Sequence, residues 1–141
     1  MMRNMNYAIK VEVKDPSIKV FSFKDQKTMY GGRQIAPGDT IFIFASENEG
    51  GSGLIARGSV LSAQATPRIP NLDRQTPRVS ITVRVTSATL RQLGRSDLKP
   101  SSDWNDGQPE TELNFKFYRQ ATNKIVGITE ATAAFLNTFF E

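Results

Sequence analysis

Short segments with the periodicity of β-strands, separated by turns rich in glycine and proline, run through most of this chain. The clearest is 78–86, where apolar residues at odd positions alternate with polar residues at even positions. This pattern predicts a strand with Val79 and Val83 on a buried face, and Arg78 and Arg84 on an exposed one. Strand patterns occur in six segments: 7–14, 40–46, 54–65, 78–86, 112–119 and 124–128.

These strands predict a mainly β fold with short helices, arranged as one small, mostly antiparallel barrel. Residues 40–46 are apolar on both faces, which predicts a strand covered on both sides. A glycine-rich loop joins them to 54–65, so the two segments should form a hairpin. The 141 residues fit a single domain over 1–141.

Three short helices are expected at the edges of the barrel. Ser22, with Asp25 three residues later, resembles a helix start and predicts a short helix that ends at the following Gly-Gly pair. A second short helix is predicted over 88–93. Thr129 predicts the N-cap of a final helix whose apolar residues recur at i,i+4. Three prolines make 66–77 a surface loop.

The chain contains no cysteine and no histidine. Disulfides, thiolate nucleophiles, Cys/His zinc sites and Ser-His-Asp triads are therefore excluded. Asp103 and Asp106 flank a tryptophan but lack the other ligands of a calcium loop. We predict no catalytic residue, no metal ligand and no cofactor.

No run approaches the roughly 20 apolar residues of a membrane span, and the first residues lack a signal-peptide pattern. We expect a cytoplasmic protein without a membrane partner.

The net charge of +4 is unevenly distributed. Residues 57–99 carry eight basic and two acidic residues, whereas 100–141 carry three basic and six acidic residues. Most of the basic residues in the middle segment are arginines, whose planar side chain suits phosphate. This distribution favours a polyanionic partner, and a solvated surface that only keeps the protein soluble is the alternative.

Trp104 is the single tryptophan and lies in a polar segment without apolar neighbours in sequence. It could anchor a lid on the barrel, or it could be a platform on which a nucleic-acid base stacks.

Three stretches, in order, resemble the EVE domain, a member of the PUA-like superfamily related to YTH readers: 13–25, 35–60 and 117–129. The first contains Val-Lys-Asp-Pro followed by Phe-Ser-Phe-Lys-Asp, and the second a Gly-Asp turn and an apolar strand ending in Phe-Ala-Ser. The third contains Arg-Gln, a short strand and a threonine-capped helix. The second stretch has Ala45 where EVE domains often have histidine. The resemblance implies a PUA-like pseudobarrel whose pocket takes one base, often modified and flipped out of its strand.

We therefore predict a module without catalytic activity that binds DNA or RNA, as a single strand or through a flipped base. Arginines should hold phosphates, and aromatic and polar groups near Ser46, Tyr30 and Trp104 should hold the base. The predicted nucleic-acid-binding residues are Tyr30, Arg33, Phe44, Ser46, Arg57, Arg78, Arg84, Trp104, Arg119 and Gln120. The alternatives are an RNA-processing enzyme of the ASCH type, which would need a tuned lysine or aspartate, and a protein-interaction module.

Overall fold

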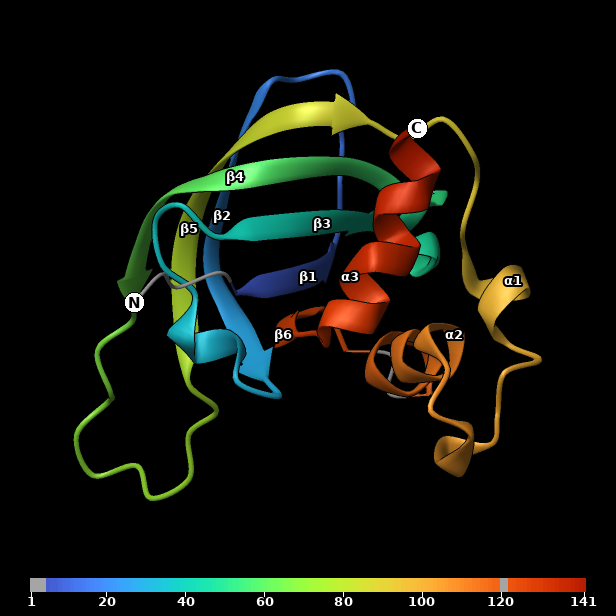
Figure 1. Cartoon of the computed structure of the whole chain (residues 1–141). Helices are drawn as coiled ribbons and strands as arrows, with labels where there is room; N and C mark the ends of the chain where they lie inside the picture. The colour runs from blue at the N-terminus through green and yellow to red at the C-terminus, as the bar shows by residue number, and fades with distance from the viewer. Residues whose placement is uncertain (1–4, 120–121) are drawn as a thin grey trace.

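The computed structural model describes residues 5–119 and 122–141, and at its centre six strands form a closed barrel (Figure 1). The strands are β1 (Asn6–Val11), β2 (Val20–Met29), β3 (Thr40–Ala45), β4 (Gly53–Ala65), β5 (Arg78–Ala88) and β6 (Lys124–Gly127). Around the barrel they follow the order β1-β3-β4-β5-β2-β6, and β6 pairs with β1. Every one of these strands therefore has two neighbours.

Four of the six neighbouring pairs are antiparallel, whereas β1–β3 and β2–β6 are parallel. The predicted mainly β fold and its mostly antiparallel barrel are confirmed. The predicted hairpin is formed by β3 and β4, and the predicted strand at 78–86 is β5. The first strand is shorter than predicted, because it ends at Val11 rather than at Lys14.

β3 separates two apolar cores. Ile41 and Ile43 point into the barrel, whereas Phe42 and Phe44 point out of it toward the helices. All four side chains are fully buried, so the predicted strand with two covered faces is confirmed. The barrel core also contains Tyr7, Ile9, Phe21, Phe23, Val79, Ile81, Val83 and Ile125. The helical-side core also contains Leu98, Leu113, Phe117, Val126, Leu136 and Phe139.

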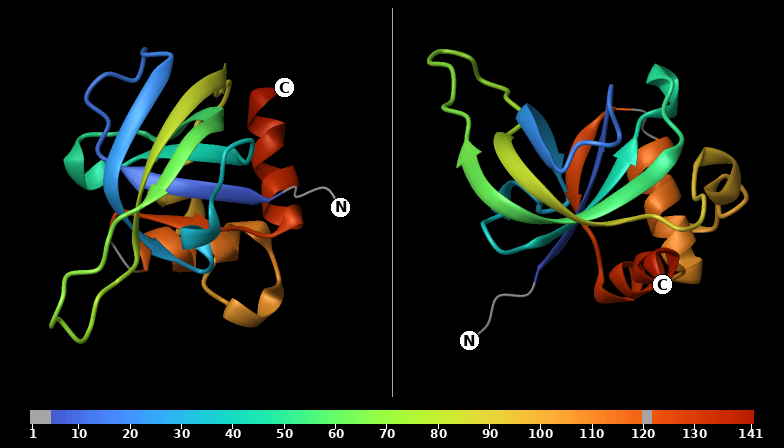
Figure 2. Two further views of the ribbon diagram at one scale, coloured as in Figure 1. Left: turned by 90° about the vertical axis from the view of Figure 1, so that its left-hand side faces the viewer. Right: turned by 90° about the horizontal axis from the view of Figure 1, so that it is seen from above.

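The helices lie on one side of the barrel, and the loop at 66–77 projects from the opposite side (Figure 2). They are α1 (Arg95–Leu98), α2 (Pro109–Leu113), α3 (Glu130–Asn137) and a π-helical turn over Asn114–Tyr118. Single 3-10 turns are formed by Gly32–Gln34, Glu47–Glu49, Trp104–Asp106 and Thr138–Phe140. The predicted cap of the final helix is confirmed, since the Thr129 side chain accepts a hydrogen bond from the Thr132 N–H.

The predicted helix beginning at Ser22 is wrong, because these residues form β2. Phe21 and Phe23 are buried and their rings stack at 5.3 Å, whereas Ser22 between them is exposed. Burial of these two rings in the barrel core outweighs the local capping pattern. Asp25, the expected helix-capping acid, lies at an irregularity of the β2–β5 pairing with a φ of 52°.

The predicted strand at 112–119 is also wrong, because this segment is helical. Pro109 stands in the first turn of α2, where a missing N–H costs nothing. The alternation of Phe115 and Phe117 has another cause: Phe117 enters the helical-side core, and Phe115 contacts Trp104. The predicted helix at 88–93 is absent as well. There the backbone N–H of Leu90 instead donates to the carbonyl of Phe139.

Candidate nucleic-acid interface

Two exposed aromatic side chains, one from the turn after β2 and one from the 3-10 turn before α2, line the same hollow. Tyr30, Trp104, Phe115 and Arg119 line a hollow of about 440 Å³, which we call the aromatic hollow. Tyr30 is 44% exposed and Trp104 is 55% exposed, so both rings remain accessible. The same two rings also line a second hollow of about 390 Å³, together with Gln108 and other polar residues. Three of the predicted site residues are therefore brought together: Tyr30, Trp104 and Arg119.

The loop around Trp104 is shaped by two aspartates. Asp103 accepts a hydrogen bond from the N–H of Asn105 at 3.1 Å. Asp106 accepts from the N–H of Gln108 at 2.8 Å and from the Thr111 hydroxyl at 2.8 Å. The indole ring rests on Phe115, with ring centroids 4.9 Å apart and planes tilted by 60°. Trp104 is thus supported on one side by packing, while more than half of its surface stays open.

Tyr30 follows the last residue of β2 and is held by its backbone. It adopts a φ of 54°, and its carbonyl accepts a hydrogen bond from the N–H of Gly127 at 3.1 Å. Gly32 must be glycine here, since a Cβ atom would lie 2.2 Å from the Ile125 carbonyl oxygen. The Gly-Gly pair therefore lets the chain turn sharply past β6 and leaves the tyrosine ring exposed.

A lysine and a glutamate form a hydrogen-bonded network next to the Tyr30 ring. The Lys116 Nζ lies 4.8 Å from the centre of the Tyr30 ring and donates to Glu112 and to the Gly127 carbonyl. Glu112 also accepts from the Thr129 and Thr132 hydroxyls at 2.8 and 2.6 Å. Burial opposes its ionisation, but the hydrogen bonds from Lys116, Thr132 and Thr129 hold the pKa of Glu112 below its usual value. This carboxylate thereby ties α2 to the start of α3.

A second candidate surface surrounds the loop at 66–77. The loop and its flanks enclose a depression of about 630 Å³, which we call the basic groove. Its lining contains five cationic side chains and no acidic one: Lys27, Arg33, Arg68, Arg74 and Arg78. Apolar side chains also line it, and Ile69 and Leu72 are 62% and 49% exposed. Two predicted site residues, Arg33 and Arg78, therefore border this groove rather than the aromatic hollow.

Lys27 and Arg78 also border a smaller polar depression of about 350 Å³. Its other lining residues include Asp25 and Glu49, so its charge is mixed. The carboxylate of Glu49 accepts a hydrogen bond from Asn123 at 2.6 Å.

Ser46 and Phe44 are buried away from both surfaces. Phe44 packs against Phe117 at 5.2 Å between ring centroids. Ser46 is 1% exposed, and its hydroxyl has no hydrogen-bond partner among the described residues. The structure places neither residue in the aromatic hollow or the basic groove.

Close to Phe117, a pair of lysines is buried side by side. Lys10 and Lys124 are partners in the β1–β6 pairing and are 1% and 0% exposed. The Lys10 Nζ donates to the Phe117 carbonyl at 2.7 Å, and the Lys124 Nζ donates to the Thr122 carbonyl at 3.1 Å. Burial, together with the charge of Lys10, lowers the pKa of Lys124 to about 8. Burial likewise lowers the pKa of Lys10, with a further contribution from Arg95.

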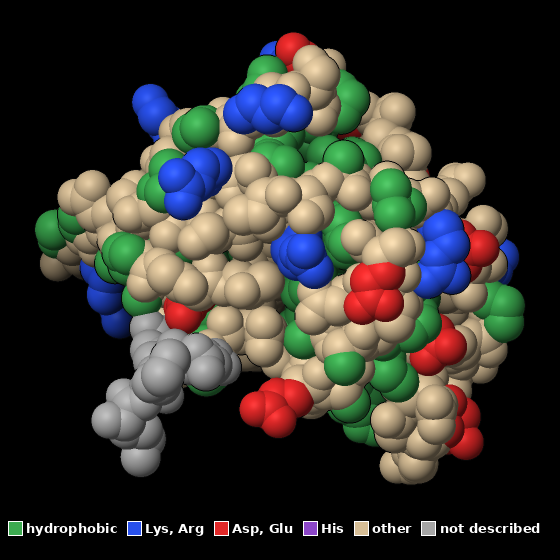
Figure 3. Space-filling model, turned by 45° about the horizontal axis from the view of Figure 1, so that its top comes forward, with side chains coloured by type: hydrophobic (Ala, Val, Ile, Leu, Met, Phe, Trp, Pro, Cys, Tyr) green, Lys and Arg blue, Asp and Glu red, His purple; other side chains and the backbone are tan. Residues whose placement is uncertain are grey.

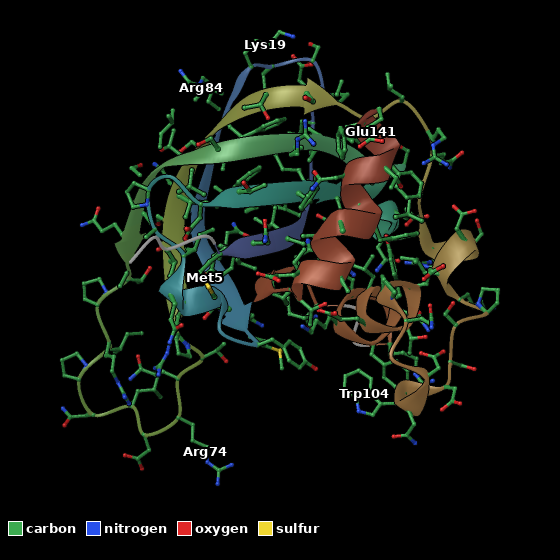
Figure 4. The ribbon with its side chains drawn as sticks, viewed as in Figure 1. Met5, Lys19, Arg74, Arg84, Trp104 and Glu141 are labelled. Atoms are coloured by element: carbon green, nitrogen blue, oxygen red, sulfur yellow. The ribbon has the colours of Figure 1, made fainter. Side chains whose placement is uncertain are left out.

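The remaining predicted residues are dispersed. The Arg57 guanidinium donates to Asn137 at 2.7 Å and to Ser87 at 3.0 Å, and it lies over the Phe140 ring. It thus fastens the C-terminal helix to β4. Arg84 is exposed at the opposite end of the molecule from Trp104 (Figure 4). Gln120 lies outside the described residues.

Several residues of these surfaces escaped prediction from sequence. The sequence pattern predicts a strand for Phe115 and Lys116, although the i,i+4 spacing of Glu112 and Lys116 is also typical of a helix. The pattern of a helix start upstream predicts a helix for Lys27, whereas the structure places it in β2, beside the arginines of the groove. Arg68 and Arg74 were visible as members of the basic segment, although only the fold shows that they enclose one groove.

On one face of the molecule the basic side chains are dispersed. On the face seen in Figure 3, lysine and arginine side chains are separated by uncharged surface, and acidic side chains gather toward one side. No group of three or more potential metal-ligating side chains occurs within the described residues. No helix in residues 5–119 and 122–141 is long and apolar enough to cross a membrane.

No family model matches the chain, and no curated protein matches it in sequence. Its structure is similar to several solved structures. The human THYN1 protein in complex with 5-methylcytosine containing DNA has a TM-score of 0.64 at 14% identity, covering 98% of both chains. The DUF55 domain of human thymocyte nuclear protein 1 has a TM-score of 0.65 at 12% identity, covering 96% of this chain and 98% of that chain.

A protein from Pseudomonas putida has a TM-score of 0.64 at 13% identity, covering 96% of this chain and 99% of that chain. Each likeness extends over nearly the full length of both chains, which confirms the fold expected from the three sequence stretches. The chain therefore has the same fold as the DUF55 domain of human thymocyte nuclear protein 1, which is consistent with the resemblance of its sequence to the PUA-like EVE domain.

Proposed function

We propose that this chain binds nucleic acid and holds one unstacked base in the aromatic hollow. The observation that carries the proposal is that two exposed aromatic rings, Tyr30 and Trp104, line one hollow with Arg119 at its border. Stacking of a base on such a ring contributes about 1–3 kcal/mol and tolerates any base. The likeness in fold to the THYN1 protein, whose structure contains 5-methylcytosine containing DNA, supports this class of ligand.

The geometry favours a base that is free of its neighbours. A base within a duplex is covered on both faces, so it can stack on Trp104 only when it belongs to a single strand or is flipped out. The two adjoining hollows measure about 440 and 390 Å³, which is the size range of small-ligand pockets. Gln108 lines the second hollow and offers an amide group to the edge of a base.

Trp104 provides a direct test, because it is the single tryptophan. We expect its fluorescence to be quenched, to saturation, by single-stranded DNA or RNA 12-mers and less by a fully paired hairpin. Parallel titrations with cytosine and 5-methylcytosine oligonucleotides measure any preference for the modified base. N-acetyltryptophanamide titrated with the same oligonucleotides is the control for non-specific absorption. Unchanged emission with every oligonucleotide, together with no retention of any of them, would overturn the proposal in favour of an interaction module.

One observation supports the alternative of an RNA-processing enzyme: the pKa of one lysine is shifted toward neutral pH. Burial lowers the pKa of Lys124 to about 8, close to the value required of a general base. However, Lys124 is fully buried and lines none of the hollows described above. Within the described residues it is not placed to reach a substrate, so we do not assign it a catalytic role.

A further inference from the structure

The basic groove has the composition of a polyanion site. Its five cations face no acidic side chain in the lining. Within the described residues, Arg33, Arg68 and Arg74 have no hydrogen-bond or ion-pair partner, whereas Arg57 and Arg91 are bonded to the C-terminal segment. Arginines that are not used inside the protein remain available for phosphate.

The groove is shaped before any ligand arrives. The Gln75 side chain accepts from the Ile69 N–H and donates to the carbonyls of Ile69 and Leu72, at 2.8–2.9 Å. At the base of the loop, Thr28 donates through both its N–H and its hydroxyl to the Pro77 carbonyl. The loop therefore has a defined shape, and less conformational entropy is lost when it binds.

The groove adjoins the aromatic hollow through one tight turn. Tyr30 lines the hollow and Arg33 lines the groove, with only Gly31 and Gly32 between them. In Figure 4 the labelled Trp104 and Arg74 both lie at the bottom of the view, whereas Lys19 and Arg84 lie at the top. The turn at 30–33 thus connects the hollow, on the helical side of the barrel, with the groove at the loop that projects from the opposite side.

We infer that the basic groove binds the backbone of the same nucleic-acid strand whose base occupies the aromatic hollow. This inference rests on the proposed function. The strand would run from Trp104 past Tyr30 and Arg33 to the loop at 66–77, with phosphates on the arginines and sugars or bases on Ile69 and Leu72. An acidic peptide would also satisfy the cations. A nucleic-acid strand is favoured because one molecule then accounts for both the exposed aromatic rings and the adjoining row of cations.

The test compares oligonucleotide lengths. Fluorescein-labelled deoxythymidine oligonucleotides of 3, 6, 12 and 24 nucleotides are titrated in fluorescence anisotropy at several salt concentrations. Wild-type affinity should rise with length as the strand extends into the groove. In the double variant Arg68→Gln/Arg74→Gln, the gain with length should shrink, and the slope of log K against log salt should become shallower by about 1.4 for the long oligonucleotides. The matched control, Lys14→Gln/Lys19→Gln, removes two exposed charges far from the groove and should leave both quantities unchanged.

The outcomes separate the two ideas. Binding of all lengths that is insensitive to the Arg68/Arg74 variant would overturn the inference and leave the proposed function standing. Absence of binding at every length would overturn both. A polyglutamate peptide that displaces the 24-mer better than unlabelled oligonucleotide would assign the groove to an acidic protein partner. Unchanged melting temperatures in both variants would show that the loss is not caused by unfolding.

Discussion

The two cores on either side of β3 differ in the chemistry they admit. The barrel core is built from aliphatic and aromatic side chains and is closed by six strands. The helical-side core is bordered by two buried lysines, a buried serine hydroxyl and the segment that supports the aromatic hollow. Both are formed by the same strands, since neighbouring residues of β1, β3 and β6 point to opposite sides.

This contrast separates the residues that stabilise the barrel from the residues that are open to a ligand. The interior of the barrel is filled with side chains and provides stability, whereas the polar groups and the hollows lie outside it. Four changes test the contrast.

The largest effect is expected inside the barrel. Val83→Asp places a carboxylate among fully buried apolar side chains, and we expect a loss of at least about 4 kcal/mol of stability. Circular dichroism should show a largely unfolded protein. Arg84→Asp, at the exposed neighbouring position, is the control and should melt close to wild type. A Val83→Asp protein that melts like wild type would contradict the assignment of a closed apolar interior.

Replacement of a buried lysine is expected to increase the stability of the protein rather than to decrease it. Because the pKa of Lys124 is about 8 in the folded protein and near 10.5 when unfolded, the unfolded chain binds more protons between these values. Stability should therefore rise as pH increases from about 7.5 to 9.5. Lys124→Met should stabilise the protein at pH 7, by on the order of 2 kcal/mol, and flatten this dependence. Thermal melts at about pH 7.5 and 9.5 measure how the stability of each protein depends on pH, with the exposed Lys14→Met variant as control. A lower melting temperature for Lys124→Met at pH 7 would refute the explanation.

A smaller effect, on affinity rather than stability, is expected at the aromatic hollow. Trp104→Ala should weaken oligonucleotide binding by about 1–3 kcal/mol without changing the salt slope, because stacking releases no counterions. A tryptophan that only anchors its loop would instead lower the melting temperature and leave affinity intact. Measuring both quantities on this one variant decides between the two interpretations.

The smallest effect distinguishes two arginines of the same strand. Arg78 borders the basic groove, although its guanidinium already donates to the Asp25 carbonyl at 2.8 Å, whereas Arg84 lies at the far end. Sequence alone predicts one phosphate contact from each. The structure leads us to expect that Arg78→Ala makes the salt slope shallower by up to about 0.7 and that Arg84→Ala leaves it unchanged. An equal effect of both would place the nucleic acid along the length of β5.

The fold could be predicted from sequence where one periodicity dominates. Alternation identified β5, the run of apolar residues identified β3, and Thr129 marked the start of α3. Prediction failed where two signals compete: Ser22 and Asp25 resemble a helix start within an alternating strand, and Phe115 and Phe117 alternate within a helix. The aromatic hollow was partly foreseen through Tyr30, Trp104 and Arg119. The sequence could not distinguish arginines that are bonded within the protein from those that line a surface groove. Only tertiary contacts show that Arg57 fastens a helix and that Arg68 faces the groove.

The position of β6 has a consequence for how this protein is made. β6 lies between β1 and β2, so Tyr7 can pair with Gly127 only after the residues up to 127 have left the ribosome. Until then, β1 and β2 expose unpaired backbone groups that can recruit other nascent chains. Tyr30 also depends on β6, since the Gly127 N–H holds its carbonyl. The aromatic hollow is therefore completed only after β6 has been synthesised and has paired with β1 and β2.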